Sequence, residues 1–303
     1  MMKWVVRALL ALGIALMTYR AAAGLGAVTA LTDYQPWGLV KAVNIFTFAT
    51  LAAGSFAVAA SVYVFGLVRL RPLVRPALTM GFVGHSFVLV ALLYDVGRPL
   101  DVWRVITNPQ PHSALLWTAW CEVVYTSVMA LELLPEYLKT QGGLSRSLSV
   151  VKVPLVILSA SFAVVYQSTL GTLFLVSPHR VSPLWYSPHL PALFFLSALA
   201  AGLGMLIMES YISDRAGRRP AEPAVTRYLA GSMCFVLAVY LVLRLSDLYT
   251  RGMFACAGVG CGRVQAVWLG TEIIAGAGIP FLIRPRLLDV GAVVLAVAAL
   301  EAA

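Results

Sequence analysis

Ionisable side chains interrupt several long apolar stretches of this chain of 303 residues. An ionisable group inside a membrane-spanning segment is costly, so each of them is a candidate for function. Such groups can pass protons, and together with amide and phenol groups they can bind the polar headgroup of a lipophilic carrier. The charged candidates are Asp95, Arg98, Glu122, Arg244, Asp247 and Glu272, and the uncharged ones at similar depth are Asn44, Tyr166 and Gln167.

Two of these acids lie well inside their apolar segments, and two other charges form a potential pair. Glu122 and Glu272 are candidates for proton transfer, together with Arg244 and Asp247. Arg244 and Asp247 are three residues apart, so they share one face of a helix and can neutralise each other. A structural ion pair that fixes helix packing is the alternative interpretation.

The histidines do not form a pattern suited to haem. Of the four in the chain, only His85 lies in the middle of an apolar segment, whereas His112, His179 and His189 lie at outer segment ends or in loops. A haem held by two axial histidines needs both at facing depths in the membrane. We therefore expect no haem, and we expect His85 to serve as a hydrogen-bonding residue in helix packing.

The four cysteines do not suggest a metal centre either. Cys121 and Cys234 lie within apolar segments, where we expect them to pack as small apolar side chains. Cys256 and Cys261 share a loop, and whether they form a disulfide stays open. Nothing resembles a zinc site or the cysteine set of an iron–sulfur cluster, so we expect no metal site.

The composition is typical of a membrane protein. Hydrophobic residues make up 60% of the chain, charged residues only 12%, and the mean hydropathy is +0.87. The net charge of +9 arises from basic residues in short loops between apolar segments, where they face anionic lipid. We therefore expect a lipid bilayer, and not nucleic acid, as the partner of these charges.

The elements that must position the candidates are about nine apolar segments, each long enough to approach the roughly 20 residues of a membrane span. The sequence thus predicts an all-α polytopic bundle. The predicted segments run near Val5–Tyr19, Leu39–Leu67, Ala77–Val96, Ala114–Leu134, Val153–Leu175, Pro191–Ile212, Tyr228–Leu248, Val264–Ile283 and Leu287–Ala303.

Basic residues are distributed unequally over the loops. Fourteen of the 22 Lys and Arg residues fall on one side of the predicted bundle and seven on the other. The positive-inside rule then places the N-terminus and the more basic side in the cytoplasm. The start of the chain, where Lys3 and Arg7 are followed by the apolar stretch Ala8 to Met17 and then by Ala21 to Ala23, also resembles a secretory signal.

Four acids fall at the cytoplasmic ends of the predicted segments. There, water or loop arginines can satisfy their charges, so we interpret them as interfacial groups. They are Glu132, Glu136, Glu209 and Asp214.

Several stretches resemble the polysulfide-reductase/NrfD family of membrane subunits, and most closely its HybB-like branch. That branch is the membrane subunit of hydrogenase-2-type [NiFe] hydrogenases, often labelled a b-type cytochrome subunit. The resemblance extends from about Gly24 to Arg286. The stretches are RPLVRPALTMGFVGHSFVLVALLYDVGRPL (71–100), VMALELLP (128–135), YQSTLGTLFL (166–175) and SPLWYSPHLPALFFLSALAAGLGMLIME (182–209).

The resemblance implies a first helix and loop over residues 1–37, a four-helix bundle with a quinone site over 38–176 and a second bundle over 177–303. Asn44, Tyr166 and Gln167 would contact the quinone, menaquinone or ubiquinone, and Asp95 and Arg98 would hold the outer end of that pocket. Relatives continue through a tenth helix, so the last helix here would be truncated.

The resemblance also implies a function. The chain, not catalytic alone, would pass electrons to quinone in the cytoplasmic (inner) membrane of a bacterium or archaeon. They would come from a [NiFe] hydrogenase, with its large and small subunits, through a periplasmic ferredoxin-like iron–sulfur subunit. Alternatives are a molybdopterin oxidoreductase or multihaem cytochrome as donor, or a secondary transporter. Tyr166 departs from a His that relatives often carry, and Trp117 from a Glu, for which Glu122 is the nearest substitute.

Overall fold

The computed structural model describes residues 2–29, 44–96, 99–137, 150–176, 181–255 and 263–274. Within these residues all regular structure is helical, as predicted. The α-helices are α1 (Met2–Ala23), α2 (Leu25–Val28), α4 (Thr50–Ala52), α5 (Gly54–Tyr63), α6 (Arg71–Asp95), α7 (Arg104–Thr107), α8 (Ala114–Tyr137), α10 (Lys152–Leu175), α11 (Leu190–Arg215), α12 (Pro223–Thr250), α13 (Met253–Ala255) and α14 (Arg263–Thr271). A π-helix (Asn44–Ala49) precedes α4, and 3₁₀ turns lie at Val68–Leu70 and Pro99–Asp101.

Five of the described helices are long and apolar enough to cross a membrane. They are α6 with the turn before it, α8, α10, α11 and α12, and they confirm five of the predicted segments. The chain is therefore a multi-pass integral membrane protein. The shorter apolar helix Thr47–Tyr63 falls within the second predicted segment. The ninth segment lies outside the described residues, so the count of nine stays a prediction.

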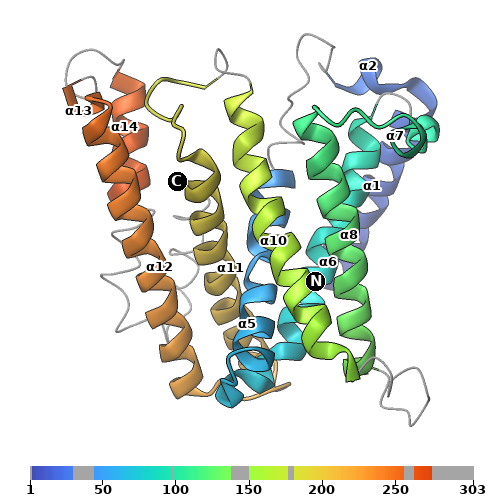
Figure 1. The fold of residues 1–303 in the computed structure, drawn as a ribbon. Helices are drawn as coiled ribbons and strands as arrows, with labels where there is room; N and C mark the ends of the chain where they lie inside the picture. Colours follow the sequence, from blue (N-terminus) through green and yellow to red (C-terminus); the bar gives the residue numbers. More distant parts are fainter. Residues whose placement is uncertain are drawn as a thin grey trace.

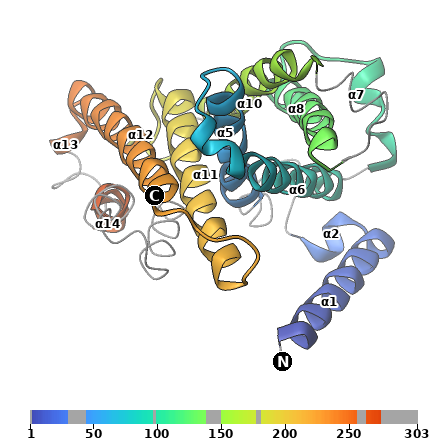
Figure 2. The same ribbon diagram turned by 90° about the horizontal axis from the view of Figure 1, so that it is seen from below.

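The first half of the chain forms a ring of four helical elements. Helix α5 contacts α6, α6 contacts α8, α8 contacts α10, and α10 returns to α5 (Figures 1 and 2). These are the helices of the predicted first four-helix bundle. Helix α11 packs on α10 and α5 on one side and on α12 on the other. Of the predicted second bundle only α11, α12, α13 and α14 are described, so that bundle and the predicted segment boundaries stay predictions.

Helix α1 stands apart from this body in Figure 2. Most of its large apolar side chains are exposed, including Leu9, Leu12 and Leu16. Its last turn is attached through Arg20, whose guanidinium donates to the backbone oxygens of Tyr94 and Val96. An isolated apolar helix of this length is stable only where lipid surrounds it.

One end of the bundle gathers basic side chains. Arg219 donates to Pro72 O at 2.6 Å and pairs with Glu209 at 2.9 Å. Lys152 forms an ion pair with Glu136. Because α6, α10 and α12 begin at this end while α8 and α11 finish there, we name it the basic face. Glu136 and Glu209 are thus satisfied by loop or helix-end cations, as predicted.

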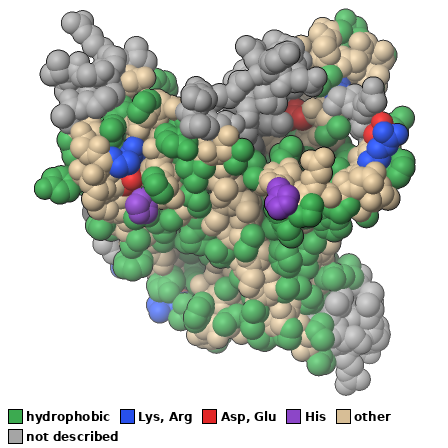
Figure 3. Space-filling model, turned by 45° about the horizontal axis from the view of Figure 1, so that its top comes forward, with side chains coloured by type: hydrophobic (Ala, Val, Ile, Leu, Met, Phe, Trp, Pro, Cys, Tyr) green, Lys and Arg blue, Asp and Glu red, His purple; other side chains and the backbone are tan. Residues whose placement is uncertain are grey.

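The sides of the molecule are apolar. Hydrophobic side chains are spread over the described surface in Figure 3, and charged ones are sparse on it. Phe87 on α6, Val164 on α10 and Phe235 on α12 are examples of large exposed apolar groups on three different helices. A surface of this kind suits hydrocarbon and not water.

Two glycines let α5 and α11 touch backbone to backbone. A Cβ atom on Gly54 would lie 2.3 Å from Gly202 O, and one on Gly202 would lie 2.0 Å from Gly54 N. Neither contact is possible for a real side chain. Small residues of this kind are typical of close helix contacts in membranes.

We expect Gly202→Ala to separate these two helices and to destabilise the protein by about 1–3 kcal/mol, as overpacking does. The midpoint of thermal unfolding in detergent should fall. Gly13→Ala on α1 is the matched control, since nothing lies within 4 Å of a Cβ there. Equal midpoints for the two variants would contradict the contact.

Candidate functional site

A cluster of buried polar side chains lies in the first bundle, and we name it the inner cluster. Its centre is the pair of His85 on α6 and Glu122 on α8, both with fully buried side chains. His85 Nδ1 lies 3.1 Å and 3.0 Å from the two carboxylate oxygens of Glu122. At these distances one proton lies in the hydrogen bond between Nδ1 and the Glu122 carboxyl group.

Two tyrosines enclose the His85 ring. The ring centroid of Tyr125 on α8 lies 4.6 Å from that of His85, and the centroid of Tyr166 on α10 lies 5.6 Å from it, both edge to face. Tyr166 is 1% exposed, and it interacts with Glu122 electrostatically. A phenol, an imidazole and a carboxylate thus meet at one point in the bundle.

Two amides complete the inner cluster. Asn44 donates to Val88 O at 3.5 Å, and Gln167 donates to Ala49 O at 2.8 Å. Asn44 begins the π-helix, a local irregularity that is frequent at functional sites.

Three polar atoms of the inner cluster have no hydrogen-bond partner among the described residues. They are Asn44 Oδ1, Gln167 Oε1 and His85 Nε2, all of them buried. An unpaired buried polar atom is expensive, so each of the three is a candidate contact for a ligand group. The two amide oxygens can accept hydrogen bonds from the hydroxyls of a quinol, and the ring nitrogen, when it carries a proton, can donate one to a quinone carbonyl oxygen.

The structure brings together most of the predicted quinone residues, but not all of them. Asn44, Tyr166 and Gln167 meet in the inner cluster, and Glu122 joins them. Asp95 ends α6, ten residues and about 15 Å of helix axis beyond His85. Its predicted place at the outer end of the bundle agrees with that distance. Arg98 lies outside the described residues.

A second group of buried charges lies at the other end of the protein's helices from the basic face, and we name it the outer cluster. Arg244 on α12 binds Glu272 with two parallel bonds, Nε to Oε1 at 2.7 Å and Nη2 to Oε2 at 3.0 Å. The Tyr240 hydroxyl donates to Oε1 at 2.6 Å, and Trp185 Nε1 donates to Oε2 at 2.8 Å. Each oxygen of Glu272 therefore has two donors.

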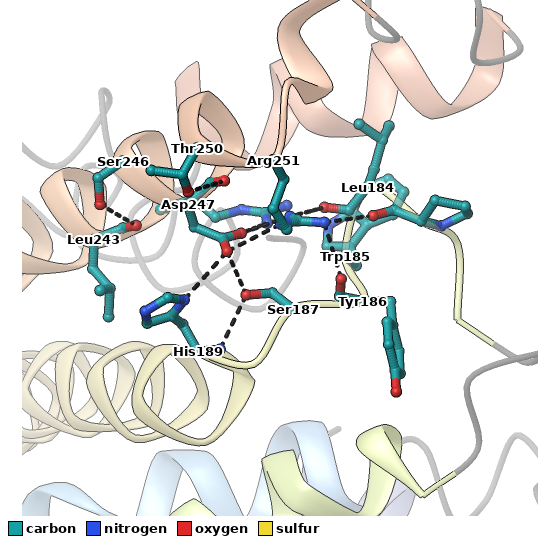
Figure 4. A network of polar contacts seen from close by, with 12 residues as sticks. Leu184, Trp185, Tyr186, Ser187, His189, Leu243, Ser246, Asp247, Thr250 and Arg251 are labelled. Atoms are coloured by element: carbon teal, nitrogen blue, oxygen red, sulfur yellow. Dashed lines mark hydrogen bonds and ion pairs between the residues drawn. The ribbon is translucent and has the colours of Figure 1, made fainter.

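Asp247 is held by a separate set of donors, drawn in Figure 4. Arg251, one turn later on α12, binds it at 2.6 Å and 3.0 Å. Ser187 donates to Oδ1 at 2.6 Å, and His189 Nδ1 lies 3.3 Å from the same atom. Arg251 also donates to the backbone oxygens of the 183–186 turn, so the cluster anchors this turn to α12.

The predicted pairing of Arg244 with Asp247 is present, but it is the weaker contact. Arg244 Nη1 lies 3.8 Å from Asp247 Oδ2, whereas the two bonds from Arg244 to Glu272 are 2.7 Å and 3.0 Å long. Spacing along one helix could not reveal the bond to Glu272, which depends on how α12 packs on α14. With its carboxylate oxygens all matched by donors, the outer cluster has the geometry of a structural clamp.

One interpretation of the sequence is wrong. Glu132 is not an interfacial group: it is 1% exposed, and neither of its oxygens has a hydrogen-bond partner among the described residues. His85 was interpreted as a packing residue, and its position in the inner cluster was missed. The signal that could have shown the burial of Glu132 is the spacing on α8, which puts Glu122, Tyr125 and Glu132 on one face.

The family model described as "Polysulphide reductase, NrfD" matches residues 27–298. The chain belongs to the NrfD family. This confirms the family resemblance noted in the sequence, and the match continues to residue 298, beyond the expected end near Arg286.

Three relatives are similar to this NrfD protein over most of its length. A protein of Nitratidesulfovibrio vulgaris is 34% identical, over 90% of this chain and 72% of its own length. The probable Ni/Fe-hydrogenase 2 b-type cytochrome subunit of Escherichia coli is 32% identical, over 84% and 67%. The integral membrane subunit of menaquinone reductase from Nitratidesulfovibrio vulgaris is 27% identical, over 76% and 58%. NrfD proteins of this kind are membrane subunits of quinone oxidoreductases.

The expectation of no haem stays a prediction. One relative's name includes a b-type cytochrome. In the NrfD chain the described histidines offer no facing pair, because His112 precedes α8 and His189 precedes α11, while His85 lies within α6. These residues do not fit a bis-histidine haem.

Proposed function

We propose that this NrfD protein is the quinone-reactive electron-transfer subunit of a respiratory complex, and that quinone reacts at the inner cluster. The observation that carries the proposal is the set of buried polar atoms without partners around the His85–Glu122 pair. The name of the menaquinone reductase relative supports the same chemistry. The chain supplies the site, and the electrons come from a partner subunit.

When bound, the quinone supplies the redox chemistry: it takes up two electrons and two protons and becomes quinol. The residues of this chain would bind and orient its headgroup. Tyr166 would donate a hydrogen bond to one carbonyl oxygen, and the unpaired amide oxygens of Asn44 and Gln167 would accept from quinol hydroxyls. Glu122 and His85 hold a proton between them next to this position.

Tyr166→Phe tests the headgroup contact. It removes one hydrogen bond, worth about 0.5–1.5 kcal/mol, so we expect a roughly two- to tenfold lower kcat/KM for quinone. Oxidation of the donor with an artificial dye should not change, because the dye bypasses the membrane site. Tyr249→Phe, at an exposed tyrosine of α12, is the matched control. Equal loss of both activities in Tyr166→Phe would remove Tyr166 from the site.

The donor is proposed to be a [NiFe] hydrogenase acting through a ferredoxin-like iron–sulfur subunit on the periplasmic side, on the strength of the Escherichia coli relative's name. Mass spectrometry of the proteins that copurify after gentle detergent extraction tests this. Hydrogenase subunits would support it. A molybdenum enzyme or a multihaem cytochrome would keep the quinone role and change the donor, and the absence of any redox partner would favour a transporter.

The acids and arginine of the outer cluster were predicted to transfer protons. A second role for them is favoured by their saturated hydrogen bonds: they fix the 183–186 turn on the side of the protein where the iron–sulfur partner is proposed to dock. Proton transfer through Arg244, Asp247 and Glu272 stays an untested prediction.

A further inference from the structure

Three exposed arginines surround the start of helix α6 at the basic face, and we name them the arginine patch. They are Arg69 in the 3₁₀ turn before the helix, and Arg71 and Arg75 in its first two turns. Among the described residues none of the three has an acid within ion-pair distance. Lys152 at the same face does form an ion pair with Glu136, which Arg71 reaches only through a longer electrostatic interaction.

The arginine patch concentrates charge of one sign on a short piece of chain. Arg71 and Arg75 are four residues apart, so their side chains lie on the same face of α6 and repel each other. Arg69 adds a third positive charge directly before them, and the first turn of α6 contains no acidic residue. This arrangement opposes folding unless an anion binds to it.

Tyrosine rings hold two of the three guanidinium groups in place. Arg75 Cζ lies 4.2 Å from the ring centroid of Tyr137, the last residue of α8. Arg69 Cζ lies 4.4 Å from the ring centroid of Tyr228 on α12. The Tyr137 hydroxyl donates to Thr79 Oγ1 at 3.0 Å, and the Thr79 hydroxyl donates to Arg75 O at 2.7 Å. A guanidinium stacked on a ring keeps N–H donors free at its edge, so the patch is preorganised to bind the oxygens of an anion.

Deeper in the membrane than the patch, the same helices expose apolar side chains. Val83, eight residues beyond Arg75 on α6, is 45% exposed, and Leu131, six residues before Tyr137 on α8, is 43% exposed. Eight residues of helix are about 12 Å long, whereas one leaflet contributes about 15 Å of hydrocarbon. With Arg75 at the level of the lipid headgroups, Val83 therefore lies at the depth of their acyl chains.

We propose that the arginine patch binds the phosphate of one anionic phospholipid, whose acyl chains lie along the apolar surface of α6 and α8. Guanidinium groups bind phosphate oxygens with two parallel hydrogen bonds, which a lipid phosphate can accept. A zwitterionic lipid carries a phosphate too, but its cationic headgroup is repelled by the patch. The positive-inside rule predicts that this face lies in the cytoplasmic leaflet, where anionic lipids are concentrated. The lipid site does not depend on the quinone chemistry of the inner cluster.

The test is native mass spectrometry of the full chain in a mild detergent, titrated with phosphatidylglycerol and, separately, with phosphatidylcholine. We expect saturable binding of one phosphatidylglycerol, tighter than that of phosphatidylcholine. Arg75→Gln should raise the Kd for phosphatidylglycerol about fivefold, and Arg75→Glu about 30-fold, as the loss of one and of two surface charges does. Arg104→Gln is the matched control: Arg104 also stacks on an aromatic ring, but it lies outside the patch and pairs with Asp101, so wild-type affinity is expected.

Each alternative outcome overturns a stated part of the proposal. Equal affinities in Arg75→Gln and Arg104→Gln would exclude the arginine patch as the site. Equal affinities of the wild-type chain for the two lipids would exclude recognition of the anionic headgroup, and this comparison needs no variant. Displacement of phosphatidylglycerol by an equal concentration of inorganic phosphate would show that the patch binds a soluble anion instead of a lipid.

Discussion

Replacing Arg244 with Met should lower the free energy of unfolding by about 3–5 kcal/mol, among the largest effects that a single substitution can have here. Arg244 is 1% exposed and is bound to Glu272 by two bonds. Without it, the Glu272 carboxylate stays buried and keeps only the Tyr240 and Trp185 donors. Thermal unfolding of the detergent-solubilised protein measures the loss.

Two further variants identify the cause. The double variant Arg244→Met with Glu272→Leu removes both charges, and it should recover most of the lost stability. Arg104→Met breaks an ion pair with Asp101 whose arginine side chain is 57% exposed, and it should cost about 0–1 kcal/mol. If the double variant is as unstable as Arg244→Met, the loss of stability comes from the lost packing of the two side chains and not from an unpaired buried charge.

The second large effect is expected on activity. Glu122→Gln should lower the rate of quinone reduction roughly 10²-fold, because it removes the carboxylate that shares a proton with His85 beside the proposed quinone position. Gln has nearly the same shape and can still contact His85, so the fold should survive. Quinone reduction and donor oxidation with an artificial dye, measured on the same complex, provide the comparison.

The control for Glu122→Gln is the dye reaction, which should keep its rate. A Glu122→Gln complex that reduces quinone at the wild-type rate would show the His85–Glu122 pair to be structural only.

The inner and outer clusters differ in how completely their polar atoms are hydrogen-bonded, and this difference supports different roles. In the inner cluster, three buried polar atoms lack partners among the described residues, whereas in the outer cluster the carboxylates of Asp247 and Glu272 are saturated with donors. A site that must bind and release a ligand keeps unpaired groups, and a clamp does not.

Much of the inner cluster was predicted from the family resemblance and from the depth of residues within their apolar segments. None of it was predicted from contacts between helices. Asn44, Tyr166 and Gln167 were named as quinone residues, and Glu122 as a proton carrier, without any indication that Glu122 would lie against Tyr166. His85 was missed because a lone histidine on an apolar helix has no sequence feature that reveals its partner. Glu132 was misplaced because its distance from the helix end was judged without the neighbouring helices that cover it.

The sequence by itself determined the class of this protein: long apolar segments require helices in lipid, since every backbone group must be satisfied within its own segment. It also indicated most of the charges that lie in those segments, because position along the chain sets their depth; Glu132 is the exception. The tertiary structure alone decided which charges meet. Arg244 binds Glu272 and His85 binds Glu122 across helices, 28 and 37 residues apart in the chain. Contacts of this kind depend on how whole helices are rotated and packed against one another. That arrangement cannot be read from single residues, because apolar side chains can face either lipid or a neighbouring helix.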